Sequence, residues 1–367
     1  MFGIDFKKYD FFLMLIISIA VIFGAMMVFS SSVIMADVRW ASPYMFFLKQ
    51  MIWVGVGFAA MAVTAFFIDY NFYRKYAKVL YAAALISVAA VLFFGVTRGG
   101  ARRWFGLGFA TVQPSEAAKI AMVIMTADFI ERKKDMLGQW QGLIAPAVLL
   151  LLLIFPIAAE PDLGTPILIS SVCFAMLFCA GIKIQAVFAL LGSGALLIAE
   201  EIARKPYRLE RMRDYFGSVV NIDAASYQVK QSLYALGSGG FFGKGPGKSE
   251  MKLMYLPEAH TDFIFPVVGE ELGFIGAAAV VSFFIYIFLK GVNISKNAPD
   301  KFAQYLALGI TCLIVFQALI NLSVATGMFP AKGLPLPFIS FGGTSLVINM
   351  AAAGILINLS RYKSVPK

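Results

Sequence analysis

The sequence predicts an all-α, polytopic transmembrane bundle of about ten helices, and three observations support this prediction. Of the 367 residues, 60% are hydrophobic and only 14% are charged, against roughly 25% charged residues in ordinary soluble domains. The apolar residues fall in long runs, and a bilayer core of ~30 Å takes about 20 residues per helix. The charged residues gather between these runs, so the apolar helix surfaces are expected to face lipid.

Ten apolar runs are the expected helices, each close to the length of one membrane crossing. They are 11–34, 46–68, 76–96, 114–131, 143–159, 165–182, 184–203, 263–290, 303–327 and 342–360. The fifth and sixth runs are short, and a polar break over 160–164 joins them. The first run is too long for a signal peptide and no small-residue cleavage site follows it, so it is expected to be a membrane span.

The positions of Lys and Arg predict the orientation of the chain. An even number of spans places both termini on one side, and most basic residues outside the long loop fall in segments on that side. The short loops on the other side carry only Arg39, Arg98, Arg102, Arg103 and Lys332. Both termini are therefore expected to be cytoplasmic. The net charge of +10 then reflects topology, and no nucleic-acid partner is expected.

Residues 204–262 form one long extracytoplasmic loop in this topology. The loop is rich in aromatic residues, and long ordered loops are usually functional. The sequence shows no internal repeat and no low-complexity tract, so a single domain over 1–367 is expected. Cys173, Cys179 and Cys312 lie inside apolar runs without metal-ligand spacing and are expected to pack as small hydrophobes.

The strongest polar cluster is the string of residues 257–262, directly before an apolar run. It contains His260, the only histidine of the chain, and it places the carboxylate of Asp262 at the start of a helix. An N-cap role would explain Asp262, because a carboxylate there accepts backbone N–H bonds and suits the helix dipole. Capping and catalysis are compatible, so both interpretations stay open.

A second cluster lies around the start of the fourth run. Arg102 and Arg103 precede it, and Glu116 and Lys119 lie three residues apart on one face of the expected helix. A charge near mid-membrane costs at least ~2.5–3.5 kcal/mol, so such charges usually face protein or water. Glu116 and Lys119 could form a structural ion pair and the arginines could anchor in lipid headgroups, or the four residues could bind an anionic substrate.

Two further clusters follow. In 160–165, Asp162 could simply cap the next helix. In 332–345, two prolines and a Gly-Gly pair predict broken backbone at membrane depth, which is tolerated only where it is buried or lines a cavity. All four clusters fall on one side of the membrane, which suits an amphiphilic, anionic, lipid-linked substrate. No residue set matches a tight metal site, although Mg²⁺ could be held loosely between carboxylates and a phosphate.

The motifs and their order resemble the SEDS family of bacterial membrane proteins, the FtsW and RodA group. The matching segments are 100–104, 113–116, 161–165, 227–228, 231–232, 237–240, 256–265, 269–273 and 333–340. Together they are specific, although each alone would be weak. Within the family the resemblance is closer to FtsW, the division member, than to RodA, the elongation member. Phe341 stands where the family usually has Tyr.

The resemblance implies a peptidoglycan glycosyltransferase that polymerises lipid II, the undecaprenyl-pyrophosphate-linked disaccharide peptide, at the outer face of the cytoplasmic membrane. It implies a class B penicillin-binding transpeptidase and other divisome or elongasome membrane proteins as partners. Asp262 is then the expected catalytic base. The expected substrate-binding residues are Arg102, Arg103, Glu116, Lys119, Asp162, His260, Gln231 and Ser340. No metal ligand is assigned, and a divalent cation, Mg²⁺ or Mn²⁺, is compatible with this chemistry.

Two other function classes stay open at this stage. Irregular backbone and intramembrane charge are also typical of transporters, so the chain could be a flippase for lipid II. The lack of a visible inverted repeat argues against that class. The chain could also be a non-catalytic scaffold for a transpeptidase.

Overall fold

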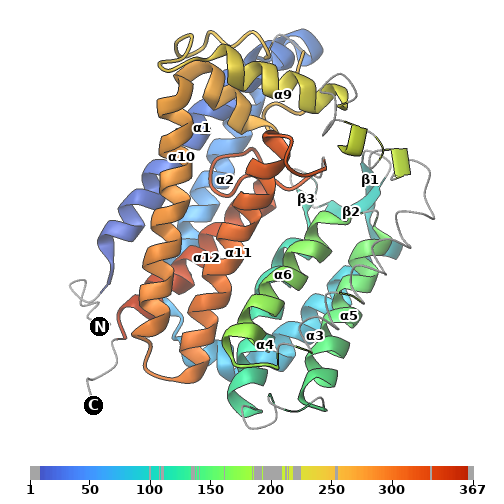
Figure 1. The fold of residues 1–367 in the computed structure, drawn as a ribbon, viewed down its shortest axis with the longest axis vertical. Helices are drawn as coiled ribbons and strands as arrows, with labels where there is room; N and C mark the ends of the chain where they lie inside the picture. The colour runs from blue at the N-terminus through green and yellow to red at the C-terminus, as the bar shows by residue number, and fades with distance from the viewer. Residues whose placement is uncertain are drawn as a thin grey trace.

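The computed structural model is a bundle of long helices with irregular segments gathered at one end (Figure 1). It describes residues 9–98, 101–106, 108, 111–133, 137, 139, 141–160, 162–183, 185, 192, 209–210, 213, 215–217, 225–252, 255–330 and 333–362. The helices are α1 (Phe11–Trp40), α2 (Met45–Ala62), α3 (Tyr70–Phe94), α4 (Pro114–Arg132), α5 (Gln141–Ala159), α6 (Gly164–Cys179), α9 (Tyr227–Ser238), α10 (Ile264–Lys296), α11 (Lys301–Ala325) and α12 (Gly343–Ser360). A short π-helix, η2 (Val63–Phe67), continues α2.

Each expected helical run except 184–203 coincides with a described helix; apart from residues 185 and 192, that run lies outside the described residues. Within the described part of the chain, 7 helices are long and apolar enough to cross a membrane: α1, α2 with η2, α3, α5, α10, α11 and α12. The helix α6 is apolar but shorter. The prediction of a mostly helical membrane bundle is therefore confirmed.

The helices α4, α11 and α12 form the middle of the bundle. In the apolar windows of α11 and α12, 67% and 61% of the residues are buried, against 28% in α2 and α3. Almost every residue of α4 is buried, because α3, α6 and α11 pack around it. Polar groups on these three helices therefore face protein, whereas α2 and α3 keep broad apolar faces for lipid.

Two features depart from the predicted pattern of helices joined by loops. A three-stranded antiparallel sheet in the order β1 (Val96–Arg98), β2 (Ala101–Gly106) and β3 (Thr111–Val112) links α3 to α4. The expected loop 204–262 is interrupted by the helix α9. Both features satisfy backbone hydrogen bonds locally in segments that the apolar pattern marked only as breaks.

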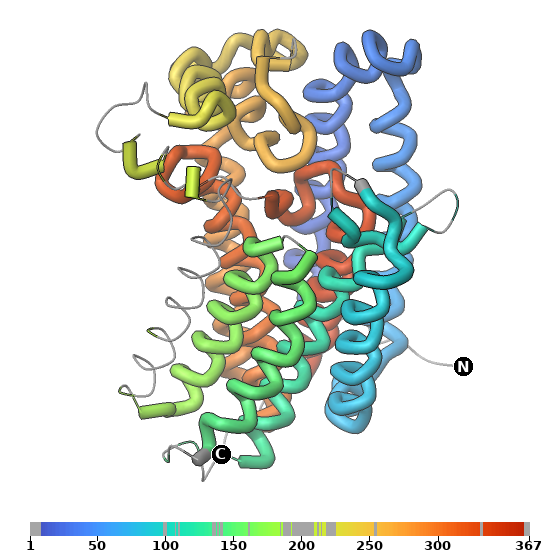
Figure 2. The backbone as a smooth tube through the Cα atoms, turned by 90° about the vertical axis from the view of Figure 1, so that its right-hand side faces the viewer, coloured from blue at the N-terminus to red at the C-terminus, as the bar shows by residue number. Residues whose placement is uncertain are grey.

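The two ends of the bundle are distinct. At one end, here called the terminus end, the backbone N–H of Asp10 before α1 donates to the hydroxyl of Ser360 in α12 at 3.0 Å. The first and last described helices therefore meet at the same end, as an even number of crossings requires. The opposite end, here called the site end, is where α4, α6, α10 and α12 begin. The sheet and α9 also lie there (Figure 2).

Candidate active site

The site is built around residues 333–341, an irregular segment that links α11 to α12. Phe338 is buried in this segment with φ +67°. A non-glycine residue held in that conformation costs about 1–3 kcal/mol, and such residues concentrate at functional sites. The helix α1 passes close to the segment because Gly24 has no side chain: a Cβ there would lie 2.6 Å from the Cα of Ile339.

Four helices begin against this segment. The helix α12 follows it directly, and the hydroxyl of Thr344 in its first turn accepts the backbone N–H of Gln113, just before α4, at 3.3 Å. A Cβ on Gly164, at the start of α6, would lie 3.0 Å from the segment. The N–H of Phe341 donates to the carbonyl of His260, shortly before α10, at 2.9 Å. Helix N-termini carry positive partial charge, so their convergence favours an anion here.

Asp262 lies against this segment. A Cβ on Gly333 would come within 3.0 Å of the Asp262 Oδ2, so the missing side chain lets the carboxylate approach the backbone. The side-chain amide of Asn321 on α11 donates to the carbonyls of Asp262 and Leu334, both at 2.8 Å. The N-cap of α10 is Phe263, without a side-chain capping bond. The interpretation of Asp262 as an N-cap is therefore wrong, and the residue is held from the side by α11.

Glu116 and Lys119 form an ion pair beneath the segment. Their charged atoms are 2.7 Å apart, and the side chains are only 4% and 1% exposed. The Lys119 ammonium also donates to Gln317 at 2.8 Å, and the Gln317 amide donates to the carbonyl of Pro335 at 2.9 Å. The interpretation of a structural pair is supported here, because Lys119 acts through Gln317 on the backbone of the segment.

The two arginines of β2 point to different partners. Consecutive residues of a strand face opposite sides of the sheet. The exposed Arg102 donates to the Thr97 hydroxyl at 3.3 Å within the hairpin. The half-buried Arg103 donates to the carbonyl of Glu160 at 2.8 Å. Its guanidinium carbon lies 6.0 Å from the centroid of the Trp104 ring. Only Arg103 therefore reaches from the sheet towards the turn between α5 and α6.

That turn carries two buried carboxyl groups. Asp162 accepts the N–H groups of Gly164 and Thr165 at 3.0 and 3.1 Å and the Thr165 hydroxyl at 2.7 Å. Asp162 therefore bonds the first turn of α6, as the capping interpretation expects, although the N-cap position itself is Leu163. Glu160 is 1% exposed, and among the described residues its carboxyl oxygens have no hydrogen-bond partner. Burial, assisted by the charge of Asp162, raises the pKa of Glu160 to about 8 although Arg103 opposes the shift.

His260 packs against two aromatic rings beside the 333–341 segment. Its ring lies 4.6 Å from that of Phe46 and 5.7 Å from that of Phe341, between centroids. Burial lowers the pKa of His260, and the charge of Arg39 lowers it further while that of Glu258 opposes them. His260 is therefore neutral near pH 7, which suits a hydrogen-bonding role rather than a cationic one.

Two other expected site residues differ in position. The hydroxyl of Ser340 accepts the N–H of Leu336 at 2.9 Å and closes the turn within the segment. Gln231 lies on α9, which is fixed to α11 by a bond from the Ser232 hydroxyl to the carbonyl of Ala325. Within the described part of the chain, Gln231 makes no hydrogen bond to residues 333–341. The structure thus brings Ser340 into the site and leaves Gln231 at its edge.

Gln317 and Asn321 are functional candidates that the sequence analysis did not assign. They lie one turn apart on α11, and each donates to a carbonyl of the segment. Both are buried in a helix whose other residues are mainly apolar. Two amides at i and i+4 in such a helix are the signal that would have found them, because buried amides need polar partners.

Comparison with known proteins places this geometry in a family. The model of the cell cycle protein family FtsW/RodA/SpoVE matches residues 10–365. The chain belongs to the FtsW/RodA/SpoVE family. It is 38% identical over 359 residues to a probable peptidoglycan glycosyltransferase FtsW of Trichlorobacter lovleyi, covering 96% of this chain and 93% of the relative. It is 37% identical over 360 residues to the stage V sporulation protein E of Bacillus subtilis, covering 96% and 97%.

Solved structures share the fold of this FtsW/RodA/SpoVE member. A chain of a peptidoglycan synthase complex, described as coordinating polymerisation and crosslinking, matches with a TM-score of 0.78 at 25% identity and covers 96% of this chain and 98% of its own. The rod shape determining protein RodA of Thermus thermophilus matches with a TM-score of 0.72 at 24% identity, covering 98% of each chain. With its long apolar helices, this family member is a multi-pass protein of the bacterial cytoplasmic membrane.

Proposed function

We propose that this chain is a peptidoglycan glycosyltransferase that polymerises lipid II into glycan strands, with Asp262 as the general base. One observation carries the proposal. The carboxylate of Asp262 lies against Gly333 at the end of the bundle where four helix N-termini converge. Transfer of a sugar from a pyrophosphate requires a base close to groups that favour an anion, and the helix N-termini are such groups. The names of the relatives support the same activity.

The proposed step divides between proton removal and stabilisation of the leaving group. Asp262 takes the proton of the acceptor sugar's 4-hydroxyl as that oxygen bonds to the anomeric carbon of the donor. The bond from that carbon to the pyrophosphate breaks, and undecaprenyl pyrophosphate leaves. The N-termini of α4, α6 and α12, with Arg103 and the exposed Arg102, favour the developing negative charge. The neutral His260 and Ser340 hold the 333–341 segment in shape.

The other candidate residues act through structure in this proposal. Glu116 and Lys119 fix the segment through Gln317, and Asp162 fixes the first turn of α6. Gln231 is proposed to meet the acceptor strand from α9. The described residues hold no group of three or more His, Cys, Asp or Glu side chains that could bind a metal. A Mg²⁺ or Mn²⁺ ion would therefore need pyrophosphate oxygens beside protein carboxylates, as Mg²⁺ sites often have.

The proposed orientation has the termini in the cytoplasm and the site at the outer face. Basic residues concentrate in the segments of the terminus end, which the positive-inside rule assigns to the cytoplasm. Lipid II would then enter the site end from the outer leaflet. A class B penicillin-binding transpeptidase is the proposed partner, together with other divisome proteins, or elongasome proteins if the role is in elongation. Similarity to a chain of a peptidoglycan synthase complex supports the transpeptidase.

The test is product analysis with the purified chain in detergent. Given lipid II, the chain alone or with the transpeptidase should form glycan strands, and Asp262→Ala should lower the rate by about 10²–10⁴-fold. The matched control is Asp37→Ala, an exposed carboxylate near the end of α1 at the same end of the bundle. A flippase or a scaffold would leave lipid II unpolymerised. Strand synthesis by a folded Asp262→Ala protein at the rate of the parent would exclude Asp262 as the base.

A role in cell division is proposed over elongation. A relative named FtsW is 38% identical to this chain, whereas the RodA structure is 24% identical. Tagged protein is expected at midcell, and localisation along the side wall would assign the elongation role instead.

A further inference from the structure

The helix α10 is broken near its start, and a distant loop bridges the break. Gly273 has φ +66° and ψ −160°, so Ile264–Leu272 is a separate half-helix. Backbone groups on both sides of the break lose their helical partners, and residues 240–245 replace them. Before the break, the carbonyl of Glu270 accepts the N–H of Lys244 at 2.9 Å, and that of Glu271 accepts the N–H of Gly245 at 3.0 Å. After the break, the N–H of Phe274 donates to the carbonyl of Gly240 at 2.9 Å, and that of Ile275 donates to the carbonyl of Phe241 at 3.4 Å.

Three glycines make this close approach feasible. A Cβ on Gly239 would lie 2.0 Å from the carbonyl oxygen of Gly269, and a Cβ on Gly243 would lie 2.2 Å from that of Glu271. A Cβ on Gly273 would lie 2.3 Å from the backbone nitrogen of Gly243. Real Cβ atoms do not approach backbone this closely, so the loop and the half-helix fit together only with glycine at these positions.

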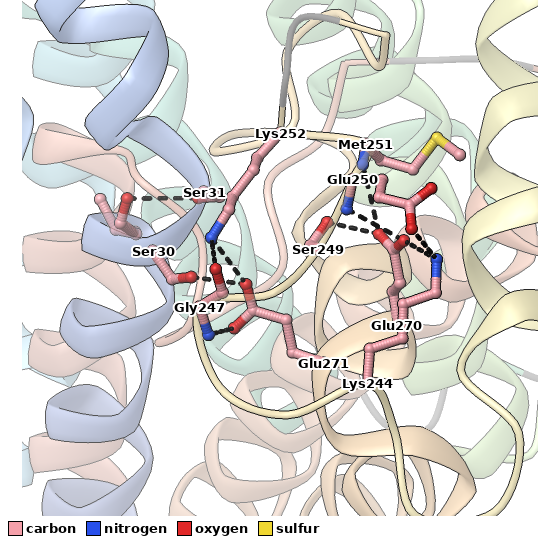
Figure 3. A network of polar contacts seen from close by, with 11 residues as sticks. Ser30, Ser31, Lys244, Gly247, Ser249, Glu250, Met251, Lys252, Glu270 and Glu271 are labelled. Atoms are coloured by element: carbon pink, nitrogen blue, oxygen red, sulfur yellow. Dashed lines mark hydrogen bonds and ion pairs between the residues drawn. The ribbon is translucent and has the colours of Figure 1, made fainter.

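The side chain of Glu270, which is 0% exposed, is surrounded by hydrogen-bond donors from the same loop (Figure 3). The ammonium of Lys244 donates to it at 2.9 Å, and the Ser249 hydroxyl donates to its other oxygen. The backbone N–H groups of Glu250 and Met251 add bonds of 3.1 and 3.4 Å. The carboxylate of Glu270 therefore accepts four hydrogen bonds from residues 244–251.

The neighbouring Glu271, which is 1% exposed, makes a second set of bonds (Figure 3). It accepts the hydroxyl of Ser30 on α1 at 2.6 Å, the N–H of Gly247 at 2.9 Å and the ammonium of Lys252 at 3.5 Å. Its two oxygens therefore accept hydrogen bonds from α1 and from residues 247–252. We call Glu270 and Glu271, with Lys244, Ser249 and Lys252, the clasp.

The clasp joins two parts of the chain that lie on either side of Asp262 in the sequence. One half of the clasp lies at residues 244–252 and the other at Glu270 and Glu271, and the chain between them includes Asp262. Nine helical residues separate Asp262 from the break, a distance of about 13 Å at 1.5 Å per residue. Because a half-helix of this length moves as one body, a tilt at the clasp displaces the carboxylate at its other end.

We propose that the clasp positions Asp262, so that Glu270, Glu271 and Lys252 are positioning residues for the glycosyl transfer. This proposal rests on the proposed function of Asp262. Asn321 holds the carboxylate end of the half-helix, where Gly333 leaves room for Asp262, and the clasp holds the end at the break. Ser30 links the clasp to α1, which also packs against the 333–341 segment at Gly24. Both the clasp that positions Asp262 and the 333–341 segment are therefore in contact with the same helix, α1.

The test compares two lysines of the same loop. Lys252→Met removes the cation that pairs with Glu271, and Lys252→Arg restores it. Lys248→Met is the matched control, because Lys248 is exposed and lies four residues earlier. Glu271→Gln removes the negative charge and turns one of the two acceptor oxygens into an NH2 donor. In detergent with lipid II, Lys252→Met and Glu271→Gln are expected to lower kcat by about 10–100-fold with KM nearly unchanged, as a misplaced catalytic group does. Lys252→Arg should recover activity, and Lys248→Met should match the parent.

A second readout does not depend on activity. In a Cys179→Ala background, which removes the exposed native thiol, Asp262→Cys is labelled with a small thiol reagent. The clasp variants should change the labelling rate at residue 262, and Lys248→Met should not. Unchanged labelling and unchanged kcat in folded clasp variants would overturn the proposal, as would a loss confined to KM. If the parent does not polymerise lipid II, the proposed function fails while the labelling still decides whether the clasp sets the position of residue 262.

Discussion

The two ends of the bundle hold their charges in different ways. At the terminus end, Arg74 pairs with Glu131 at 2.8 Å while the arginine side chain is 42% exposed, and Lys290 pairs with Asp10 at 2.9 Å while the lysine is 33% exposed. At the site end, the Lys119–Glu116 pair is almost entirely buried. The same type of interaction is therefore solvated at one end and enclosed by protein at the other.

This difference separates anchoring from positioning. Exposed ion pairs contribute about 0–1 kcal/mol because water screens them. A buried pair carries a desolvation cost, and removing one partner leaves the other charge uncompensated. At the site end the buried charges are also bonded to backbone, as Lys119 is through Gln317 and Glu271 is through Gly247. We infer that charges of the site end fix backbone geometry, whereas those of the terminus end mainly fasten helix ends.

The largest expected effect tests this contrast directly. Lys119→Met should lower the free energy of unfolding by about 3–5 kcal/mol, because Glu116 is left as an unpaired buried charge. Arg74→Met, the same type of change at the terminus end, should cost only about 0–1 kcal/mol. Chemical unfolding of both variants in the same detergent measures the difference. Equal losses for the two variants would show that burial does not distinguish the two ends.

Asn321→Ala should have the next largest effect. It removes a buried hydrogen bond to the carbonyl of Leu334 and a partly buried one to the carbonyl of Asp262, and a buried unsatisfied group costs about 1–3 kcal/mol. Because the amide ties the base to the segment, glycan synthesis should fall more than stability alone explains. Asn293→Ala, which removes an exposed amide pair with Asn297 near the end of α10, is the control. Full activity of Asn321→Ala at a temperature where it stays folded would contradict this role.

The helices and one capping residue could be predicted from the sequence because their causes are local. An apolar run of about 20 residues has few alternatives to a membrane helix. Asp162 caps the helix that begins two residues later, so its partners are near it in the chain. The prediction of Asp262 as the N-cap was wrong, because α10 has Phe263 as its N-cap. The carbonyl of Asp262 is instead bonded by Asn321, which lies 59 residues away in the sequence.

The missed features share a dependence on long-range contacts. The bond from Ser30 to Glu271 joins residues 241 positions apart, and that from Lys119 to Gln317 joins residues 198 apart. The i, i+4 spacing of Gln317 and Asn321 could mark them as polar, but no local pattern identifies their distant partners. The β1–β3 sheet was missed for another reason: strands of two to six residues are too short for period-2 alternation to stand out from a polar loop.

The smallest expected effect concerns the opposite pH responses of two carboxyl groups. At the site end, burial and Asp162 raise the pKa of Glu160 to about 8. At the terminus end, burial tends to raise the pKa of Asp69, but bonds from Tyr362 and Asn71 outweigh it and hold that pKa below 3.8. Asp69 therefore stabilises the fold above pH 3.8, and this contribution is lost as the pH falls below it.

Glu160 acts in the opposite sense and in a different pH range. The folded protein keeps a proton on Glu160 that the unfolded chain releases near pH 4.5, so stability should fall as pH rises from 4.5 to about 8. Glu160→Gln keeps the shape without the titration and should flatten that decline, whereas Asp69→Asn should leave it unchanged and act only at lower pH. Unfolding curves across this range measure both slopes. If the stability of the Glu160→Gln protein declines as steeply with pH as that of the parent, another group causes the decline. Glu160 would then be ionised in the buried turn between α5 and α6.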